Sequence, residues 1–426
     1  MEEFSVFQLV SVVLRGMLGV LVDSTSLVFF WIVMAIVFLQ YRRISATEGE
    51  FTKGSSGALL KTMRSLGQGI LGGFLGSMVL VLTGASVGQM GLSMIWIVAL
   101  ILAMFDVRLM CFSYAGGVVG ALGLIFGWDS VDPAAIGVLV GALHLVEAGL
   151  ILTTGGDDAI PTLVRGEGGL PAGAFAMQRF WPVPLAVGIM MLLPKEVLGA
   201  AVLPMPDWWP LLRPAVQVET GMEHVYALIS TTAVLGYSEL AVARTPARRA
   251  RSTALLSGVF SAVLLGLSLT VGNAAWGKWL ICLFSPVGHE LMVYIARRQE
   301  RTRAPIYQSR GSGLMVLHVI PGSPADQAGL ASGDLIEAVN CQPVNTLDDI
   351  RSALELVPFA AVLDVRSMLP GSKQPHRTLQ IRASGNRMGM ILVPDSGEVD
   401  QEPYSRTGLM AAIVARLRVI AGKRGS

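Results

Sequence analysis

The sequence contains little charge and few cysteines. Only 15% of its 426 residues are charged, and the formal net charge is +2. Proteins that hold nucleic acid by its phosphates present a basic patch, and no basic stripe with interleaved aromatic residues occurs here, so nucleic acid is not an expected partner. The three cysteines, Cys111, Cys282 and Cys341, are scattered and lack Cys-x-x-Cys spacing, which argues against a disulfide framework or a paired-cysteine metal site.

The apolar content, in contrast, is high. Hydrophobic residues make up 53% of the chain, glycine occurs 48 times, and the mean hydropathy is +0.60. This composition is typical of a multi-span membrane protein. The opening residues, MEEFSVFQLV, are acidic and lead into no small-residue cleavage site, so the first apolar segment is expected to stay in the mature protein.

Several segments are apolar over the roughly 20 residues that a membrane-spanning helix needs. A short additional candidate at residues 7–22 carries Arg15 in its middle, so it either crosses the bilayer or lies along its surface as an amphipathic helix. The nine full-length spans are expected near residues 24–41, 69–86, 89–105, 109–127, 134–152, 183–203, 224–243, 253–273 and 276–296.

Lysine and arginine gather in alternate loops, which indicates the cytoplasmic side of the membrane. The loops after the first, third, fifth and seventh expected spans carry these residues, whereas residues 127–133 and 205–224 are poor in them apart from Arg213. The sequence ARRQERTR at 296–303 follows the ninth span. The whole carboxyl-terminal region is therefore expected in the cytoplasm.

Small residues recur at the spacing that brings helix backbones close together. This pattern favours a compact bundle or a dimer seam, so a homo-oligomer stays open. The pairs are Gly69 with Gly73, Gly72 with Gly76, Gly116 with Gly120, and Gly123 with Gly127.

Two pairs of polar residues lie within expected spans, where burying a charge is expensive. His144 and Glu147 share one helix face, and Lys195 and Glu196 follow Pro194, which favours a kink or partial unwinding of a helix. We interpret both pairs as hydrogen-bonding groups that hold helices together. A transporter would use them as proton or substrate contacts, but no internal repeat of the spans supports that alternative.

The stretch FSPVGHELMVY at 284–294 places His289 and Glu290 near the end of the ninth span. A zinc helix of the His-Glu-x-x-His type needs a second imidazole four residues after the first, and that position holds Val293. The sequence therefore predicts no catalytic residue, no metal and no cofactor. His289 and Glu290 are expected to reach water or to bond neighbouring helices.

From residue 311 the long apolar runs give way to alternating patterns and turn signals. Thr346 and Asp349 stand at capping-box spacing before one amphipathic segment. We expect strands at 313–320, 333–340, 360–367 and 376–383, a short helix within 321–330 and a longer helix at 346–357.

The residues VIPGSPADQAGLASGDLIEAVN at 319–340 and NRMGMILVP at 386–394 resemble a PDZ domain in the circularly permuted order of bacteria. The resemblance implies that a partner peptide pairs with an exposed strand edge at 389–393 beside the helix at 346–357. Free amides around residues 388–390 would bind a terminal carboxylate. The expected peptide-binding residues are Leu347, Arg351, Leu354, Arg387, Met388, Gly389, Met390 and Ile391.

The tail ends in TGLMAAIVARLRVIAGKRGS at 407–426, a basic amphipathic helix by its spacing. It suits an anionic membrane surface or a partner groove, and packing on the PDZ module is the alternative. The expected domains are thus a multi-span region at 1–300, a cytoplasmic PDZ domain at 305–395, and a linker with tail helix at 396–426.

The whole arrangement resembles the MinJ family of membrane factors, which place cell division in Gram-positive rod-shaped bacteria. HLVEAGLIL at 144–152 and RGEGGLPAGAFAMQRFWPVPL at 165–185 also look like segments of that family. The resemblance implies a scaffold at septum and poles that bridges DivIVA to MinD.

We therefore predict an α-helical polytopic membrane bundle of 9–10 spans followed by a small, mostly β PDZ domain of the α/β class. Its predicted role is non-enzymatic. The alternatives are a relative of PDZ-containing intramembrane metalloproteases and a transporter with a regulatory PDZ domain.

Overall fold

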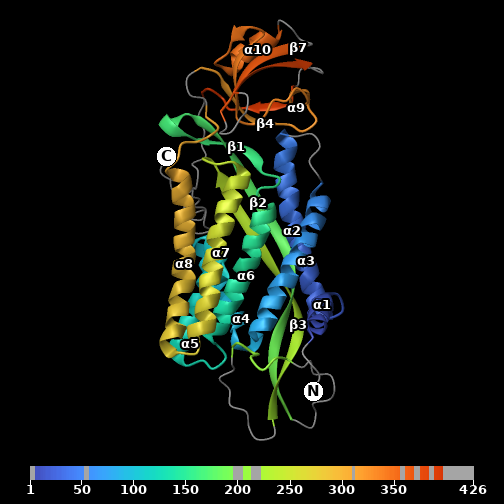
Figure 1. The fold of residues 1–426 in the computed structure, drawn as a ribbon, viewed down its shortest axis with the longest axis vertical. Coiled ribbons are helices and arrows are strands. Elements are labelled where there is room, and N and C mark those ends of the chain that lie inside the picture. Colours follow the sequence, from blue (N-terminus) through green and yellow to red (C-terminus); the bar gives the residue numbers. More distant parts are fainter. Residues whose placement is uncertain are drawn as a thin grey trace, which may run out of the picture.

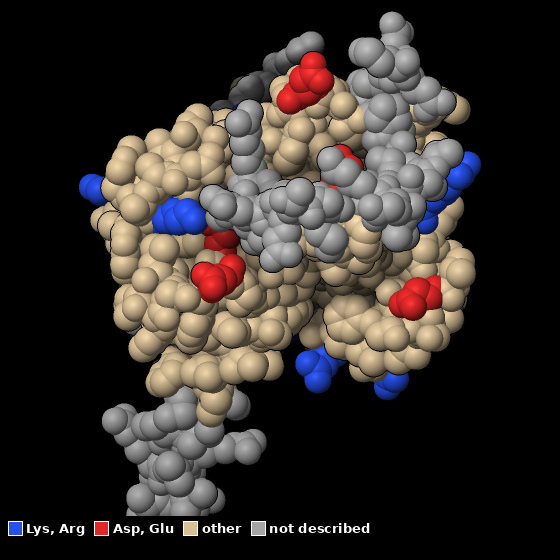
Figure 2. All heavy atoms as spheres, turned by 90° about the horizontal axis from the view of Figure 1, so that it is seen from below, with Lys and Arg blue, Asp and Glu red and all other residues tan. Residues whose placement is uncertain are grey.

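The computed structural model describes residues 5–51, 57–194, 205–212, 222–308, 312–355, 360–368, 375–382 and 388–396. An elongated body of lengthwise helices surrounds a long β-hairpin, and a compact sheet-rich part lies at one end (Figure 1). Seen from the opposite end, the surface is mainly uncharged, with isolated acidic and basic side chains (Figure 2).

Five helices of the body are long and apolar enough to cross a membrane, namely α2, α3, α6, α7 and α8. Helix α6 is the central one, because 78% of its apolar window is buried inside the protein. The helices are α1 (Val6–Leu18), α2 (Ser24–Phe51), α3 (Ala58–Thr83), α4 (Leu92–Phe105), α5 (Phe112–Phe126), α6 (Pro133–Thr154), α7 (Pro246–Val271) and α8 (Ala275–Arg301).

Short helices complete the body. Helix α1 has 13 residues and a length of about 20 Å, less than the ~30 Å hydrocarbon core of a bilayer. It buries Leu9, Val13 and Met17 against its neighbours. Short 3-10 turns connect the helices, among them η1 (Gly19–Leu21), η2 (Val87–Gln89), η3 (Val107–Met110) and η4 (Glu167–Gly169).

Two of the expected membrane helices are strands. Residues 183–194 belong to β2 (Pro171–Pro194) and residues 224–241 to β3 (Met222–Ala241), so the expectation of nine to ten helical spans is wrong there. These strands pair antiparallel from Phe175 opposite Ala241 to Pro194 opposite Met222, and β1 (Ile160–Arg165) pairs with the start of β2. Residues 195–203 lie outside the described part of the chain.

After residue 176, the edge of β2 that faces away from β3 has no strand partner among the described residues, and other groups satisfy its backbone amides. An edge strand in an apolar environment needs partners for its backbone amides. Pro182 and Pro184 have no N–H to satisfy, and hydroxyl groups accept from amides on the same side of the strand. These bonds join Phe180 N to Tyr41 (3.2 Å), Ala186 N to Ser77 (2.9 Å) and Met190 N to Ser86 (2.9 Å).

Glycines on α3 allow this close approach. A Cβ atom at Gly69 or Gly73 would collide with the carbonyl oxygens of Pro182 and Pro184, so the helix lies directly on the strand backbone. Gly72 and Gly76 face α6 instead, against Val146. The predicted close contact therefore involves both a strand and a helix.

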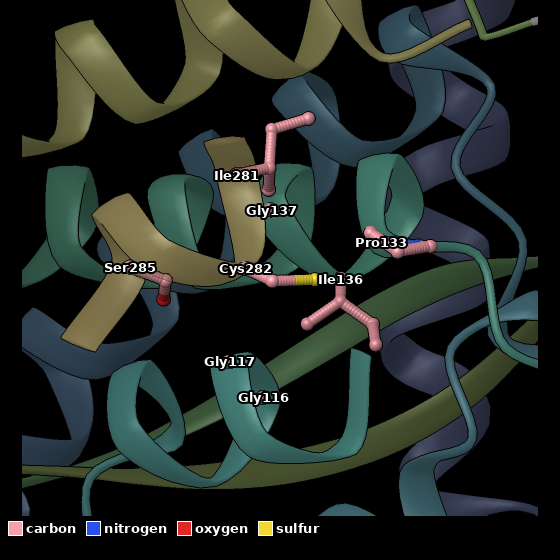
Figure 3. Close-up of a pocket in the computed structure, with 8 residues that line it drawn as sticks. All are labelled: Gly116, Gly117, Pro133, Ile136, Gly137, Ile281, Cys282 and Ser285. Carbon is pink, nitrogen blue, oxygen red and sulfur yellow. The ribbon is translucent and has the colours of Figure 1, made fainter. Parts of the chain in front are cut away.

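The second group of small residues joins α5, α6 and α8 (Figure 3). A Cβ atom at Gly117 would overlap Pro286, and one at Gly120 would lie 2.8 Å from the sulfur of Cys282. The space between these residues is too small for a water molecule, so this junction is packing and not a substrate cavity. Gly127 differs from the prediction, since it caps α5 with a φ of 69°.

The carboxyl-terminal part is a sheet in the order β8-β7-β5-β4-β9, with β6 paired to β5. The strands and helices expected between residues 313 and 383 are present among the described residues. The elements are β4 (Leu314–Val319), α9 (Pro324–Gln327), β5 (Asp334–Val339), β6 (Gln342–Pro343), α10 (Leu347–Glu355), β7 (Ala360–Ser367), β8 (His376–Arg382) and β9 (Met390–Leu392).

This sheet packs on the hairpin of the body. The Gly173 amide donates to the Tyr307 carbonyl at 2.7 Å, and the ring of Phe175 lies 6.2 Å from that of His318. Leu317 and Val393 meet Gly173, where a side chain would overlap them. The two parts are thus joined by apolar contact as well as by the chain.

Candidate peptide-binding site and intramembrane polar cluster

Strand β9 forms an edge of the carboxyl-terminal sheet. It pairs with β4, and its other edge has no strand partner among the described residues. Met390 and Leu392 pack against the core of the PDZ-like part, whereas Ile391 and Val393 point toward the hairpin of the body. This alternation is that of an ordinary strand, and it places Ile391 away from the expected groove.

The turn before β9 has a fixed conformation. Gly389 has a φ of 77°, and its carbonyl accepts from the Ile320 amide at 2.8 Å. The Met388 carbonyl accepts from the Ala325 amide at 3.0 Å. A side chain at Gly389 would overlap Ser323, so this position requires glycine both for φ and for space.

Helix α10 is capped as the sequence predicts. The hydroxyl of Thr346 accepts from the Asp349 amide at 3.1 Å, and the Asp349 carboxylate accepts from the amides of Asn345 and Thr346, each at 2.8 Å. These hydrogen bonds to the charged form lower the pKa of Asp349. The Leu347 amide donates to Asp395 at 3.4 Å, which links the start of α10 to the chain after β9.

The other expected peptide-binding residues divide between two environments. Leu354 is partly buried against the same apolar cluster as Met390 and Leu392, and Leu347 is 37% exposed, so α10 carries one core-facing and one exposed leucine. The side chain of Arg351 is 72% exposed and pairs with Asp348 on its own helix. Ile350 of the same helix is buried in the core of this part. Arg387 and the predicted tail helix at 407–426 lie outside the described residues.

The polar residues of the body meet in an unexpected way. His144 on α6 and His289 on α8 lie with their rings 5.3 Å apart, and Cys111 stands between their Nε2 atoms, at 3.3 Å and 3.8 Å from its sulfur. Glu290 accepts from the Tyr114 hydroxyl at 2.6 Å. This agrees with the expectation that His289 and Glu290 bond neighbouring helices.

His144 contacts Cys111 at the start of another helix, α5, and not Glu147 on its own helix. Its Nδ1 bonds the Val140 carbonyl of its own helix at 2.8 Å, and no hydrogen bond joins it to Glu147 in the described part of the chain. Lys195 and Glu196 are not among the described residues. Sequence reasoning missed Cys111 because it counted this residue as an apolar member of a span. The polar break DVR at 106–108 just before it was the available signal.

A buried ion network joins the hairpin to α7 and α8, and it was also missed. Arg249 is 1% exposed and contacts Glu239 of β3 at 2.5 Å and Glu300 of α8 at 3.8 Å. Glu300 also accepts from the amides of Val242 and Ala243. Buried charges of opposite sign that are also hydrogen-bonded hold such a junction in one geometry.

Residues 315–367 match the family model of the PDZ domain. The protein is therefore an apolar helical membrane protein with a PDZ domain near its carboxyl end.

The particular relatives confirm the resemblance. The chain is 27% identical over 277 residues to the "cell division topological determinant MinJ" of Bacillus subtilis, a match that covers 64% of each chain. It is 31% identical over 121 residues to Rhophilin-1 of Homo sapiens, which covers 24% of this chain and 17% of that one. The chain thus spans a little under two thirds of MinJ.

Proposed function

We propose that this protein is a membrane-anchored scaffold whose PDZ domain recruits partner proteins by adding a strand of the partner to β9. The observation that supports this most directly is the free edge of β9 next to the apolar side chains of α10. Backbone hydrogen bonds along the edge would supply affinity, and contact with apolar residues of α10 such as Leu347 and Leu354 would favour an apolar side chain of the partner.

The same proposal assigns the partners and the location. A MinJ-like role implies division proteins of the DivIVA and MinD kind, so the scaffold would bridge them at septum and poles. The basic residues after α8 and in the alternate loops favour a cytoplasmic PDZ domain. We further propose that the membrane region comprises residues 1–300, the PDZ domain residues 305–395, and the linker with the tail helix residues 396–426. The proposed role is non-enzymatic.

A pull-down with the full-length protein in detergent micelles tests the groove. The bait is the wild type, Leu354→Asp or Leu347→Asp, and the prey are DivIVA-like and MinD-like proteins of the same cell. Each variant is expected to reduce capture by about tenfold, since a charge would lie in a desolvated contact. The matched control is Met368→Asp, because Met368 is a 46% exposed apolar residue elsewhere on the module.

If the wild type, both groove variants and the control capture the prey equally, the proposal that partners bind between β9 and α10 is refuted. Imaging a fluorescent fusion in its native cell tests the division role separately. Enrichment at septa and poles is expected, and a uniform membrane signal would contradict that role while leaving peptide binding intact.

A further inference from the structure

Three ligating side chains from distant parts of the chain converge in the body. Cys111 lies at the start of α5, His144 in the middle of α6 and His289 in the second half of α8. One ligand atom from each lies within 4.8 Å of the other two. The packing of α5, α6 and α8, not the spacing within one helix, creates the cluster.

The two distances from the Cys111 sulfur to the imidazole nitrogens fit coordination to a single ion. A tetrahedral zinc ion, with bonds of about 2.3 Å to sulfur and about 2.05 Å to nitrogen, holds these two atoms about 3.5 Å apart. The sulfur of Cys111 lies 3.3 Å from Nε2 of His144 and 3.8 Å from Nε2 of His289. The observed separations lie on either side of the ideal value.

The hydrogen bonds of the two imidazoles fix which nitrogen faces the cluster. The Val140 carbonyl only accepts, so Nδ1 of His144 carries a proton. The Tyr114 hydroxyl donates to Glu290 at 2.6 Å, so its oxygen accepts from Nδ1 of His289 at 3.1 Å. In the neutral rings, both Nε2 lone pairs then point toward Cys111.

A thiol has one proton and cannot satisfy two acceptors at once. A cation bound to a thiolate and both Nε2 atoms satisfies all three groups. Metal-binding histidines commonly donate their other N–H to a carbonyl or, through further groups, to a carboxylate, as His144 and His289 do here. One thiolate and two imidazoles are ligands that suit a divalent ion of intermediate softness, such as Zn²⁺.

The surroundings are those of a sheltered site with one polar side. Phe260 packs on both histidine rings, at 5.2 Å and 5.7 Å between ring centroids, and is itself buried. On the other side, Arg108 pairs with Asp106 at 3.0 Å and approaches Glu290, whose side chain is 53% exposed. An ion would enter along this polar side.

We propose that Cys111, His144 and His289 form a binding site for one divalent transition-metal ion, zinc in the first place. The ion would fasten α5 and α6 to α8, the helix that leads into the PDZ domain, and its fourth position would be open to water. Glu290 is bonded to Tyr114, so no hydrolytic step is assigned. The site does not depend on the proposed recruitment of partners.

The test is metal analysis of the full-length protein, purified in detergent after supply of Zn²⁺ and removal of free ion. About one zinc per chain is expected for the wild type, and about a tenth or less for Cys111→Ser and for His289→Gln. The matched controls Cys282→Ser and His224→Gln change the same residue types outside the cluster and are expected to keep the metal. Substoichiometric zinc in the wild type, or full zinc in Cys111→Ser, would overturn the proposal.

A second measurement uses the unaltered chain and so does not depend on how variants fold. Zn²⁺ is expected to slow alkylation of Cys111 by a maleimide by about tenfold or more, and a chelator is expected to restore it. Cys341 is exposed on the PDZ domain and serves as the internal control. If the protein contains about one zinc per chain and the alkylation rate of Cys111 is nevertheless unchanged, coordination by its thiolate is contradicted.

Discussion

Two strands, β2 after residue 176 and β9, each have one edge without a strand partner among the described residues, and the molecule treats these two edges in opposite ways. After residue 176, the edge of β2 that faces away from β3 is covered by α3, whose glycines allow close contact, and hydroxyl groups such as that of Ser77 accept from its amides. The free edge of β9 lies beside α10 and has no strand partner among the described residues. A covered edge belongs to the architecture, and an open edge is available for recognition.

The largest effect is expected from closing the space that admits β2. In Gly73→Ala, the new Cβ would collide with the backbone carbonyl of Pro184, which no side-chain rotation relieves. The free energy of unfolding should fall by about 3 kcal/mol or more. Gly67→Ala on the same helix is the control, since nothing lies within 4 Å of the added carbon. Thermal unfolding in detergent measures both, and equal melting temperatures would contradict the described contact.

The corresponding change at the open edge is Gly389→Ala. Its positive φ and the overlap with Ser323 should destabilise the turn by about 2 kcal/mol and reduce peptide capture, while the body remains folded. Gly322→Ala separates the two causes, because it has a φ of 73° but no atom within 4 Å of its Cβ. Hydrogen exchange of residues 388–393 and the pull-down provide the readouts.

Removing one hydroxyl sharpens the account of the covered edge. Ser77→Ala leaves the Ala186 amide without its acceptor in a buried site, so a loss of about 1–3 kcal/mol is expected. Thr153→Ala should change little, because that hydroxyl bonds only carbonyls of its own helix, at 2.9 Å and 3.2 Å. Similar unfolding curves for the two variants would show that the amide finds another partner.

The smallest effect concerns the contact between the two parts. Burial lowers the pKa of His318 below its usual value of 6.5. The stability that its neutral ring provides against Phe175 is therefore complete above about pH 6.5 and is lost as the pH falls through the lowered pKa. The protection factors of the β4 amides, that is, their exchange relative to the intrinsic rate at the same pH, should fall on acidification, and His318→Phe should abolish this response. The control is His376→Phe at an exposed position of β8, and this variant should keep the response to pH.

The PDZ domain was predictable because its signals are local. The capping residues Thr346 and Asp349 and the turn glycine Gly389 each act within a few residues, and the structure has them as expected. The two strands of the hairpin were misassigned because an apolar run of about 20 residues suits a membrane helix equally well. The prolines at 182 and 184, two residues apart, were the local sign of an edge strand.

By itself, the sequence determined that the chain has apolar membrane helices and a PDZ domain, since composition, periodicity and turn residues decide these features locally. Only the tertiary structure decided that β2 is a strand beside α3 and that Cys111 stands between His144 and His289. The physical reason is the same in both cases. The acceptors for the β2 amides and the companions of the Cys111 sulfur come from segments far away in the chain, and folding alone brings them within bonding distance.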